Sequence, residues 1–171
     1  MFKNVESLKE LFEIELRYAY DCERKLLDKG LPRMIDAARS PELQAALRQH
    51  LEETRSHAAR LEKVFSVAGL QAKTKDNEVI DAMISAAKDS ANNIEASALR
   101  DTALIVNGNI VEHYEMALYG SLAAVARQIG LASAIGPLEE TLREEKAADA
   151  KLTQLAEAST NAQAAVARGA S

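Results

Sequence analysis

The feature that most constrains the fold is a helical spacing of apolar residues, which runs through four long segments of the chain. Apolar side chains recur at alternating intervals of three and four residues, the repeat that places them on one face of an α-helix. The 171 residues include only seven glycines and three prolines, and no clear run alternates apolar and polar residues as a half-buried strand does. The pattern predicts an all-helical protein, most simply a single domain.

Helix start and stop signals divide the chain into segments. Ser40 followed by Pro41 is a typical helix start, and Gly69 follows the end of the segment that begins there. Gly30 with Pro32 two residues later predicts the end of the first helix. The predicted helical segments are 5–29, 32–38, 41–68, 77–88, 96–128 and 133–158.

The lengths of the connections predict how these helices are arranged. Short connections join the first long helix to the second and the third to the fourth, so each pair should be antiparallel. The connection from 69 to 95 is long and holds a short helix. Two hairpins joined by one long crossover is the connectivity of ferritin-like four-helix bundles; an up-down-up-down bundle is the alternative. We expect the bundle to cover 1–158 and residues 159–171 to form a disordered tail.

Composition excludes several classes of function. The net charge of −5 provides no basic surface for nucleic acid. The single cysteine, Cys22, excludes an intramolecular disulfide and a multi-cysteine metal site within one chain. No segment is apolar over the length of a signal peptide or a membrane span. We therefore expect a soluble cytoplasmic protein with neither a membrane nor a nucleic acid as partner.

Each of the four long helices carries at least one acid on its apolar stripe, near its middle. A single such acid is more often a half-exposed edge residue or a paired polar group of the core. Four at similar depth are harder to explain without neutralisation, because buried carboxylates repel one another. Two divalent cations would neutralise them, and this ligand set suits iron or manganese better than structural zinc. The predicted metal ligands are Glu15, Glu53, His57, Glu112, Glu115, Glu145 and Asp149.

The fourth helix also allows another register. The string Leu-Glu-Glu-Thr occurs at 51–54 and again at 138–141, which would make Glu140 and Glu144 the counterparts of Glu53 and His57. We prefer Glu145 and Asp149, since they fall on the apolar line rather than beside it.

Other histidines are assigned lesser roles. His50 lies two turns before His57 on the same stripe, and we expect it to support the site rather than to bind metal. His113 points away from the face of Glu112 by about 100°, which favours a structural or interface role.

Several segments carry a resemblance to a known family. They are Leu11-Phe-Glu-Ile-Glu-Leu, His50-Leu-Glu-Glu-Thr-Arg-Ser-His57, Glu112-His-Tyr-Glu and Glu144-Glu-Lys-Ala-Ala-Asp149. Together they resemble the YciE/YciF-type ferritin-like proteins from residue 8 to about residue 156. The resemblance implies a rubrerythrin-like bundle that forms homodimers, a di-iron centre and a link to stress responses.

Two departures from the wider ferritin-like pattern make the predicted site asymmetric. Such bundles carry Glu-x-x-His on two helices, whereas here His57 follows Glu53 by four residues. On the fourth helix Asp149 stands where a histidine is expected. A site with one histidine is harder and more anionic. Three consequences are open: weaker affinity for iron, a preference for manganese, or a packed polar core in place of a metal site.

The leading functional hypothesis is a carboxylate-bridged di-iron oxidase, of the ferroxidase or peroxidase type. It would oxidise Fe(II) with dioxygen or reduce peroxide. Glu53 and either Glu145 or Glu112 would bridge the ions, and the other predicted ligands would be terminal. One alternative is a metal-free helical stress protein that acts through its dimer surface. Another is an iron- or manganese-binding protein without turnover.

Overall fold

The computed structural model describes residues 4–166, and every regular element in that range is helical. Two π-helical turns, η1 and η2, interrupt otherwise α-helical segments. The elements in chain order are α1 (Leu8–Lys25), η1 (Leu26–Gly30), α2 (Leu31–Ala37), α3 (Pro41–Val67), α4 (Glu78–Asn93), α5 (Ser97–Gln128), α6 (Ala132–Leu155), η2 (Ala156–Thr160) and α7 (Asn161–Val166).

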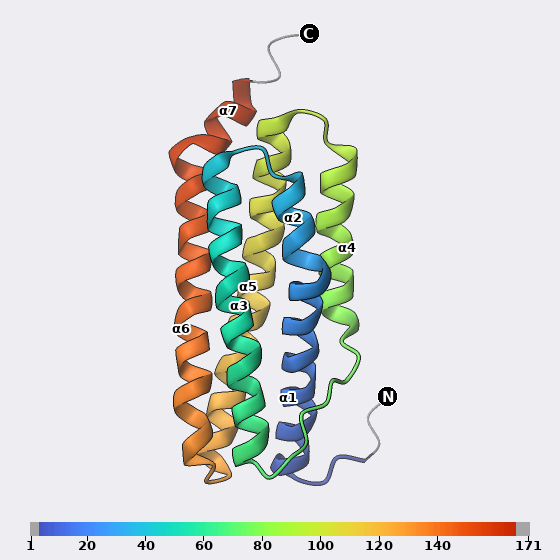
Figure 1. The fold of residues 1–171 in the computed structure, drawn as a ribbon, viewed down its shortest axis with the longest axis vertical. Coiled ribbons are helices and arrows are strands. Elements are labelled where there is room, and N and C mark those ends of the chain that lie inside the picture. Colours follow the sequence, from blue (N-terminus) through green and yellow to red (C-terminus); the bar gives the residue numbers. More distant parts are fainter. Residues whose placement is uncertain (1–3, 167–171) are drawn as a thin grey trace.

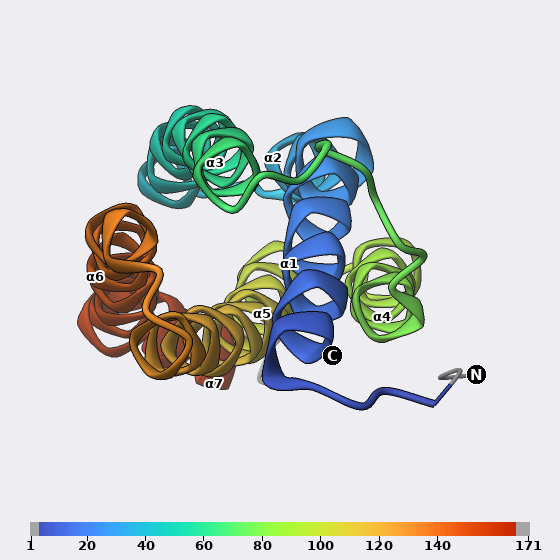
Figure 2. The same cartoon turned by 90° about the horizontal axis from the view of Figure 1, so that it is seen from below.

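Four long helices form the bundle. In Figure 1, α1 is antiparallel to α3, and α5 is antiparallel to α6. The crossover between the two hairpins contains α4, which packs outside the bundle against α5 and α1 (Figure 2). This arrangement confirms the predicted ferritin-like bundle of two hairpins joined by a long crossover. Within residues 4–166, none of the helices is long and apolar enough to cross a lipid bilayer.

The predicted end of the first helix at Gly30 is wrong. The chain stays helical from Leu8 to Ala37, and at η1 the N–H of Leu31 bonds the carbonyl of Leu26, five residues earlier. Gly30 has a φ of −63°, an ordinary helical value rather than the left-handed one of a C-terminal cap. Pro32 falls in the first turn of α2, directly after the wide turn, where its missing N–H is tolerated.

Other predicted helix ends are confirmed. The Ser40 hydroxyl accepts the N–H of Leu43 at 3.3 Å and caps the start of α3. Gly69 and Gly130 have φ values of 70° and 75° and follow the ends of α3 and α5. Only glycine adopts this left-handed conformation without strain, so these two residues end the helices.

The domain boundary expected at residue 158 is not where the helical structure ends. The chain continues through η2 and α7 to Val166, and Thr160 is buried. The expected disordered tail is therefore wrong for residues 159–166, where an alanine-rich segment forms a helix that packs against α5. Residues 167–171 lie outside the described residues.

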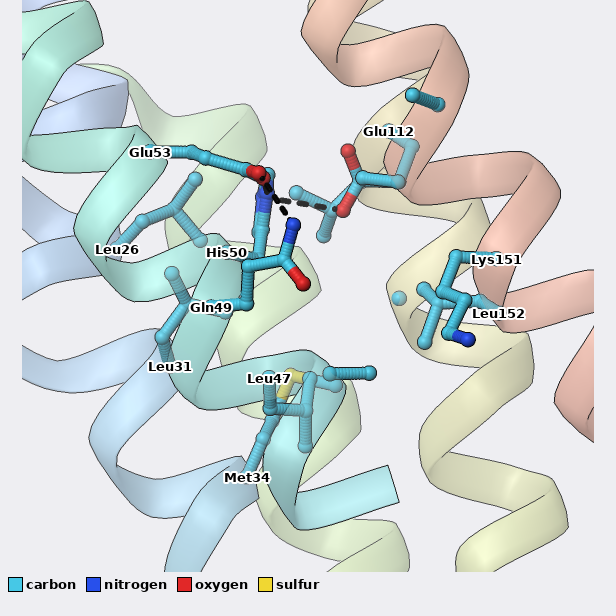
Figure 3. Close-up of a pocket in the computed structure, with 15 residues that line it drawn as sticks. Leu26, Leu31, Met34, Leu47, Gln49, His50, Glu53, Glu112, Lys151 and Leu152 are labelled. Atoms are coloured by element: carbon cyan, nitrogen blue, oxygen red, sulfur yellow. Dashed lines mark hydrogen bonds and ion pairs between the residues drawn. The ribbon is translucent and has the colours of Figure 1, made fainter. Parts of the chain in front are cut away.

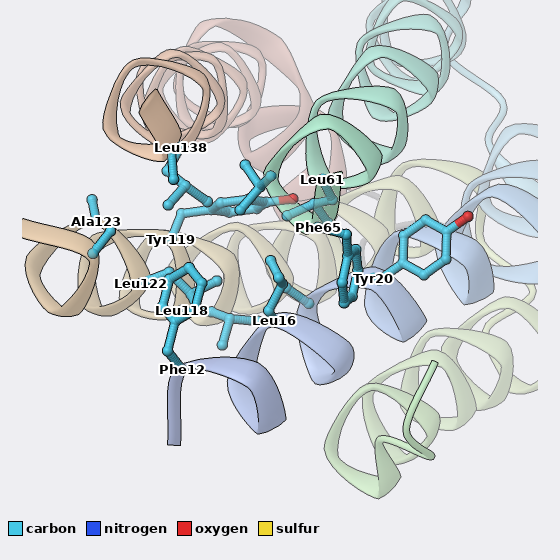
Figure 4. Packing of buried hydrophobic residues seen from close by; sticks show 14 of the residues in the cluster. Phe12, Leu16, Tyr20, Leu61, Phe65, Leu118, Tyr119, Leu122, Ala123 and Leu138 are labelled. Carbon is cyan, nitrogen blue, oxygen red and sulfur yellow. The ribbon is translucent and has the colours of Figure 1, made fainter. Parts of the chain in front are cut away.

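Two apolar clusters fill the bundle, one above the other. The lower cluster contains Phe12, Leu61, Tyr119 and Leu138 among others, and Figure 4 shows these side chains meeting between the four long helices. The upper cluster draws on earlier parts of α3 and α5 and on η1 and α2. On every long helix the residues between the two clusters include a buried acid or histidine.

Candidate metal centre

Six buried side chains with potential metal-ligating atoms lie between the two apolar clusters. They form two groups, and within each group one ligating atom per residue lies within 4.8 Å of the others. The first group is His50, Glu112, Glu115 and Glu145, and the second is Glu23, His57 and Glu145. Glu145 belongs to both. We call these six residues the central cluster: Glu23, His50, His57, Glu112, Glu115 and Glu145.

Close approaches without hydrogen bonds characterise the central cluster. His57 Nδ1 lies 2.9 Å from Glu145 Oε1, and His50 Nε2 lies 3.3 Å from Glu112 Oε1, yet neither oxygen of Glu145 has a hydrogen-bond partner. Among residues 4–166, seven of the ten buried side-chain nitrogen and oxygen atoms that lack a hydrogen-bond partner belong to this cluster. Such unpaired buried atoms are costly, and a bound cation is one of the few arrangements that satisfies them together.

Burial and mutual repulsion dominate the electrostatics of the carboxylates. Burial raises the pKa of Glu112 and of Glu115 well above the usual range, and the Glu145 carboxylate raises both further. Burial also raises the pKa of Glu23 to about 7, against the opposing effect of His57. In the absence of a cation, the cluster therefore holds protons that a free carboxylate would release.

His57 is fixed at both ring nitrogens. Its Nε2 lies 2.8 Å from Glu144 Oε2, and Glu144 also accepts a hydrogen bond from Arg60 Nη2 at 2.9 Å. Its Nδ1 therefore faces the cluster, towards Glu145 and, at 3.7 Å, Glu23. Burial opposes the charged imidazolium, but the surrounding carboxylates outweigh it and raise the pKa of His57 to about 9.

Two further buried side chains contact the carboxylates. The Tyr119 hydroxyl donates a hydrogen bond to Glu23 Oε1. The Cys22 thiol lies 3.6 Å from Glu115 Oε1 and donates to it. Burial raises the pKa of both donors well above the usual range, so each keeps its proton. Cys22, the single cysteine of the chain, therefore helps to orient Glu115.

The seven predicted ligands fall into three sets. Glu53 is half-buried at the edge of the cluster, with Oε2 3.5 Å from His50 Nδ1. Asp149 is also half-buried, and its Oδ1 lies 3.4 Å from Nε2 of the exposed His113. Glu15 is the only one that lies clearly elsewhere. The predicted ligands that lie inside the central cluster are His57, Glu112, Glu115 and Glu145.

Glu15 lies on a different part of α1. It is half-buried and lines a surface hollow with Tyr18 and Tyr114. Its placement among the central carboxylates is therefore wrong, and Glu23, two turns later, lies there instead. His50, which was expected only to support the site, is a member of the cluster. The fourth-helix register that was not preferred contributes Glu144, but as the partner of His57.

The comparisons with known proteins identify the family. A family described as "Domain of unknown function (DUF892)" matches residues 7–165. The chain belongs to the DUF892 family. It is 36% identical over 154 residues to Protein YciF of Escherichia coli (strain K12), covering 90% of this chain and 92% of YciF. The predicted resemblance to YciF-type proteins is confirmed.

Solved structures of this type superimpose closely on the bundle. The match to the E. coli stress protein YciF covers 92% of this chain and 99% of the YciF chain, with a TM-score of 0.88 and 35% identity. The match to YcfI from Rhodopseudomonas palustris covers 90% of this chain and 97% of YcfI, with a TM-score of 0.86 and 35% identity. A protein from Xanthomonas campestris pv. campestris (XCC3681), at 20% identity and a TM-score of 0.73, shares the fold alone.

Proposed function

We propose that this DUF892 protein holds two iron ions, or two manganese ions, in the central cluster and acts as an oxidase. Its reaction would be the oxidation of Fe(II) by dioxygen or the reduction of peroxide. The observation that carries the proposal is the set of seven unpaired buried atoms shared by four carboxylates and two imidazoles. Four carboxylates and two histidines on four helices suit such ions, which prefer oxygen ligands with some imidazole.

The two groups of the cluster assign the ligands. Glu23 and His57 would hold one ion, and His50 with Glu112 and Glu115 would hold the other. Glu145 would serve both, because it belongs to both groups. Glu53 and Asp149 lie at the edge and would remain available as additional oxygen ligands.

The surrounding residues prepare these ligands. Glu144, held by Arg60, pairs with His57 Nε2 and leaves Nδ1 for an ion. Tyr119 and Cys22 fix the orientation of two carboxylates through their protons. The apolar clusters above and below exclude bulk water, which strengthens every electrostatic interaction in between. Bound iron would supply the electrons that dioxygen or peroxide accepts.

One observation favours a second candidate, a metal-free polar core. With a pKa of about 9, His57 is positively charged at neutral pH in the absence of an ion. A charged His57 neutralises part of the cluster by itself. In this candidate the protein would act by binding a partner, which is compatible with the description of YciF as a stress protein.

Metal stoichiometry separates the two candidates. Protein stripped with chelator is loaded with Fe(II) under anaerobic conditions, desalted and analysed by mass spectrometry for elements. We expect about two ions per chain. Glu145→Gln should remove most of the bound iron, because Glu145 belongs to both groups. Glu139→Gln, a half-buried acid on the same helix that pairs with Arg127 and lies outside the central cluster, is the matched control and should bind like the unchanged protein.

The outcomes are decisive in both directions. Less than about a tenth of an ion per chain would contradict the proposed metal centre and favour the metal-free polar core. Stoichiometric iron that consumes neither dioxygen nor peroxide would leave a metal-binding protein without turnover. Homodimer formation and a cytoplasmic location stay predictions; light scattering of the purified chain checks the former.

A further inference from the structure

A cavity of about 270 Å³ opens beside the central cluster, between α3, α5 and α6. The cavity is separate from the space in which an ion would lie, although two of its lining residues, His50 and Glu112, belong to the central cluster. A volume of this size corresponds to roughly nine water-sized groups. It is therefore large enough for a small organic molecule rather than for dioxygen or peroxide alone.

The lining divides the cavity into an aliphatic part and a polar end. Figure 3 shows His50, Glu53 and Glu112 together at one end, with Met34 and Leu47 at the other. The aliphatic side chains come from η1, α2, α3, α5 and α6 and are all buried. They are Leu26, Leu31, Met34, Leu47, Val111 and Leu152. A chain of methylene groups would bury its surface against them, and an elongated polar molecule would not.

The polar end contains buried atoms without partners. His50 Nδ1 and Glu112 Oε2 are buried and make no hydrogen bond. Gln49 completes this end and donates its amide to Glu53. A hydroxyl group can donate to Glu112 and can either donate to or accept from His50, whichever ring nitrogen carries the proton. Lys151 lines the cavity together with Glu53 and Glu112, so the lining carries groups of both signs. A carboxylate or ammonium head group would lose its hydration on entering this mostly aliphatic cavity, and a neutral hydroxyl loses far less.

We propose that this cavity binds a medium-chain aliphatic alcohol of about eight carbons, with its hydroxyl beside His50 and Glu112 and its chain among the aliphatic side chains. The proposal adds an organic ligand to the site. It rests on the cavity and not on the metal centre proposed above, so it applies to protein without metal. If iron is also bound, the hydroxyl end lies next to the residues that would hold it.

Calorimetric titration of the chelator-treated full-length protein with 1-butanol, 1-hexanol, 1-octanol and 1-decanol tests the chain length. Each added methylene should strengthen binding about fourfold, as burial of one methylene predicts. The gain should stop near eight carbons, because the cavity is then full. No saturable binding of either 1-hexanol or 1-octanol would overturn the proposal.

The head group is tested with ligands of equal chain length. Octanoate and octylamine should bind at least about tenfold more weakly than 1-octanol to chelator-treated protein, because each must bury a charged head group that loses its hydration. Octanoate or octylamine binding as tightly as 1-octanol would overturn the assignment of a hydroxyl.

Filling the cavity tests its location. Ala46 and Ala148 line it, so the double variant Ala46→Leu/Ala148→Leu should weaken binding of 1-octanol about tenfold or more. The matched control Ala45→Leu/Ala150→Leu changes two exposed alanines on the same helices and should stay within about twofold. Equal losses in both double variants would place the alcohol elsewhere and overturn the proposal. Should the cavity variant fail to fold, the chain-length series and the head-group comparison still decide.

The same titration in iron-loaded protein keeps the two proposals apart. Alcohol binding in protein that takes up no iron would support the cavity and contradict the metal centre. Iron uptake without alcohol binding in either sample would support the metal centre and contradict the cavity proposal.

Discussion

At the scale of single residues, two neighbours in the chain have opposite roles at one imidazole. Glu144 is half-buried and pairs with His57 Nε2, while Glu145 is fully buried and faces Nδ1. Because they are consecutive on α6, the imidazole between them is held from both sides. A carboxylate on the outer nitrogen of a metal-binding histidine normally raises its affinity for the ion.

Removing the outer carboxylate should therefore weaken binding without abolishing it. Glu144→Ala is expected to lower the affinity for Fe(II) about tenfold, the usual effect of losing such a partner. Competition with a chelator of known affinity measures it, and Glu139→Ala is the control. Unchanged affinity would show that the pairing of Glu144 with His57 is unimportant for binding, and complete loss would make Glu144 itself a ligand.

The two acids of α1 give a second prediction. Glu23→Gln should reduce bound iron by about half, because Glu23 belongs to one of the two groups. Glu15→Gln should leave the stoichiometry unchanged, since Glu15 lies at a separate hollow. Metal analysis of both variants checks this. The opposite result would restore Glu15 as the ligand on the first helix.

The positions of these acids explain why some buried acids were predictable from the sequence and others were not. In α3 the strictly alternating stripe passes through His50, Thr54 and His57, all of which are buried, so Glu53 falls at its edge. In α1 a second alternating stripe, Leu16, Ala19, Glu23 and Leu26, is the buried one. Two stripes that are offset by one residue both have the alternating spacing of three and four residues. Only packing against neighbouring helices decides which of the two is buried.

At the scale of elements, one side chain ties the start of α3 to α5. Asp101 is 3% exposed and accepts the backbone N–H groups of Arg39 and Ser40 at 2.8 and 2.7 Å. These groups lie at the turn between α2 and α3. The carboxylate therefore supplies the partners that this turn cannot provide for itself.

Loss of this carboxylate should destabilise the fold. Asp101→Ala is expected to lower the free energy of unfolding by about 3 kcal/mol, because two backbone N–H groups lose a charged acceptor. Urea denaturation measures the change, and Asp89→Ala at an exposed position of α4 is the control. A loss below about 0.5 kcal/mol, the range of ordinary surface substitutions, would contradict it.

Helix boundaries were predictable where a local signal decides them. The capping side chain of Ser40 and the left-handed glycines act within a few residues, so the sequence reveals them. The passage through Gly30 does not depend on a local signal. Helix continues there because α2 packs against α3 and α4, and such tertiary contacts override the stop signal of Gly30 and Pro32.

At the scale of the whole molecule, the buried cluster links stability to pH. Glu23 has a folded pKa of about 7 against 4.5 for a free carboxyl, and His57 about 9 against 6.5. Both values are raised, so both groups stabilise the fold while protonated. That contribution is complete below the unfolded values and is lost as pH rises through about 7 for Glu23 and about 9 for His57.

The metal-free protein should therefore melt at a lower temperature at pH 9 than near pH 6, by several degrees. Calorimetry in the presence of chelator measures this. Iron-loaded protein should show a weaker or reversed trend, because ions displace these protons and bind more tightly as pH rises. A melting temperature of the stripped protein that increases over this range would contradict the charge assignments.

The π-helical turn at Leu26–Gly30 bears on how the family tolerates changes in length. One extra residue is held in that turn, so the helix before it and the helix after it keep their own rotational phase. Deleting a single residue there would return the turn to α-helical hydrogen bonding and leave Leu31 and Met34 in the core. Inserting one more residue, which the turn does not absorb, would instead rotate α2 by about 100° relative to α1 and move Leu31 and Met34 away from the cavity that they line. Homologues with one residue fewer at this point should therefore keep the cavity beside the central cluster, whereas homologues with one residue more should differ in what fits there, even when every residue of the cluster is kept.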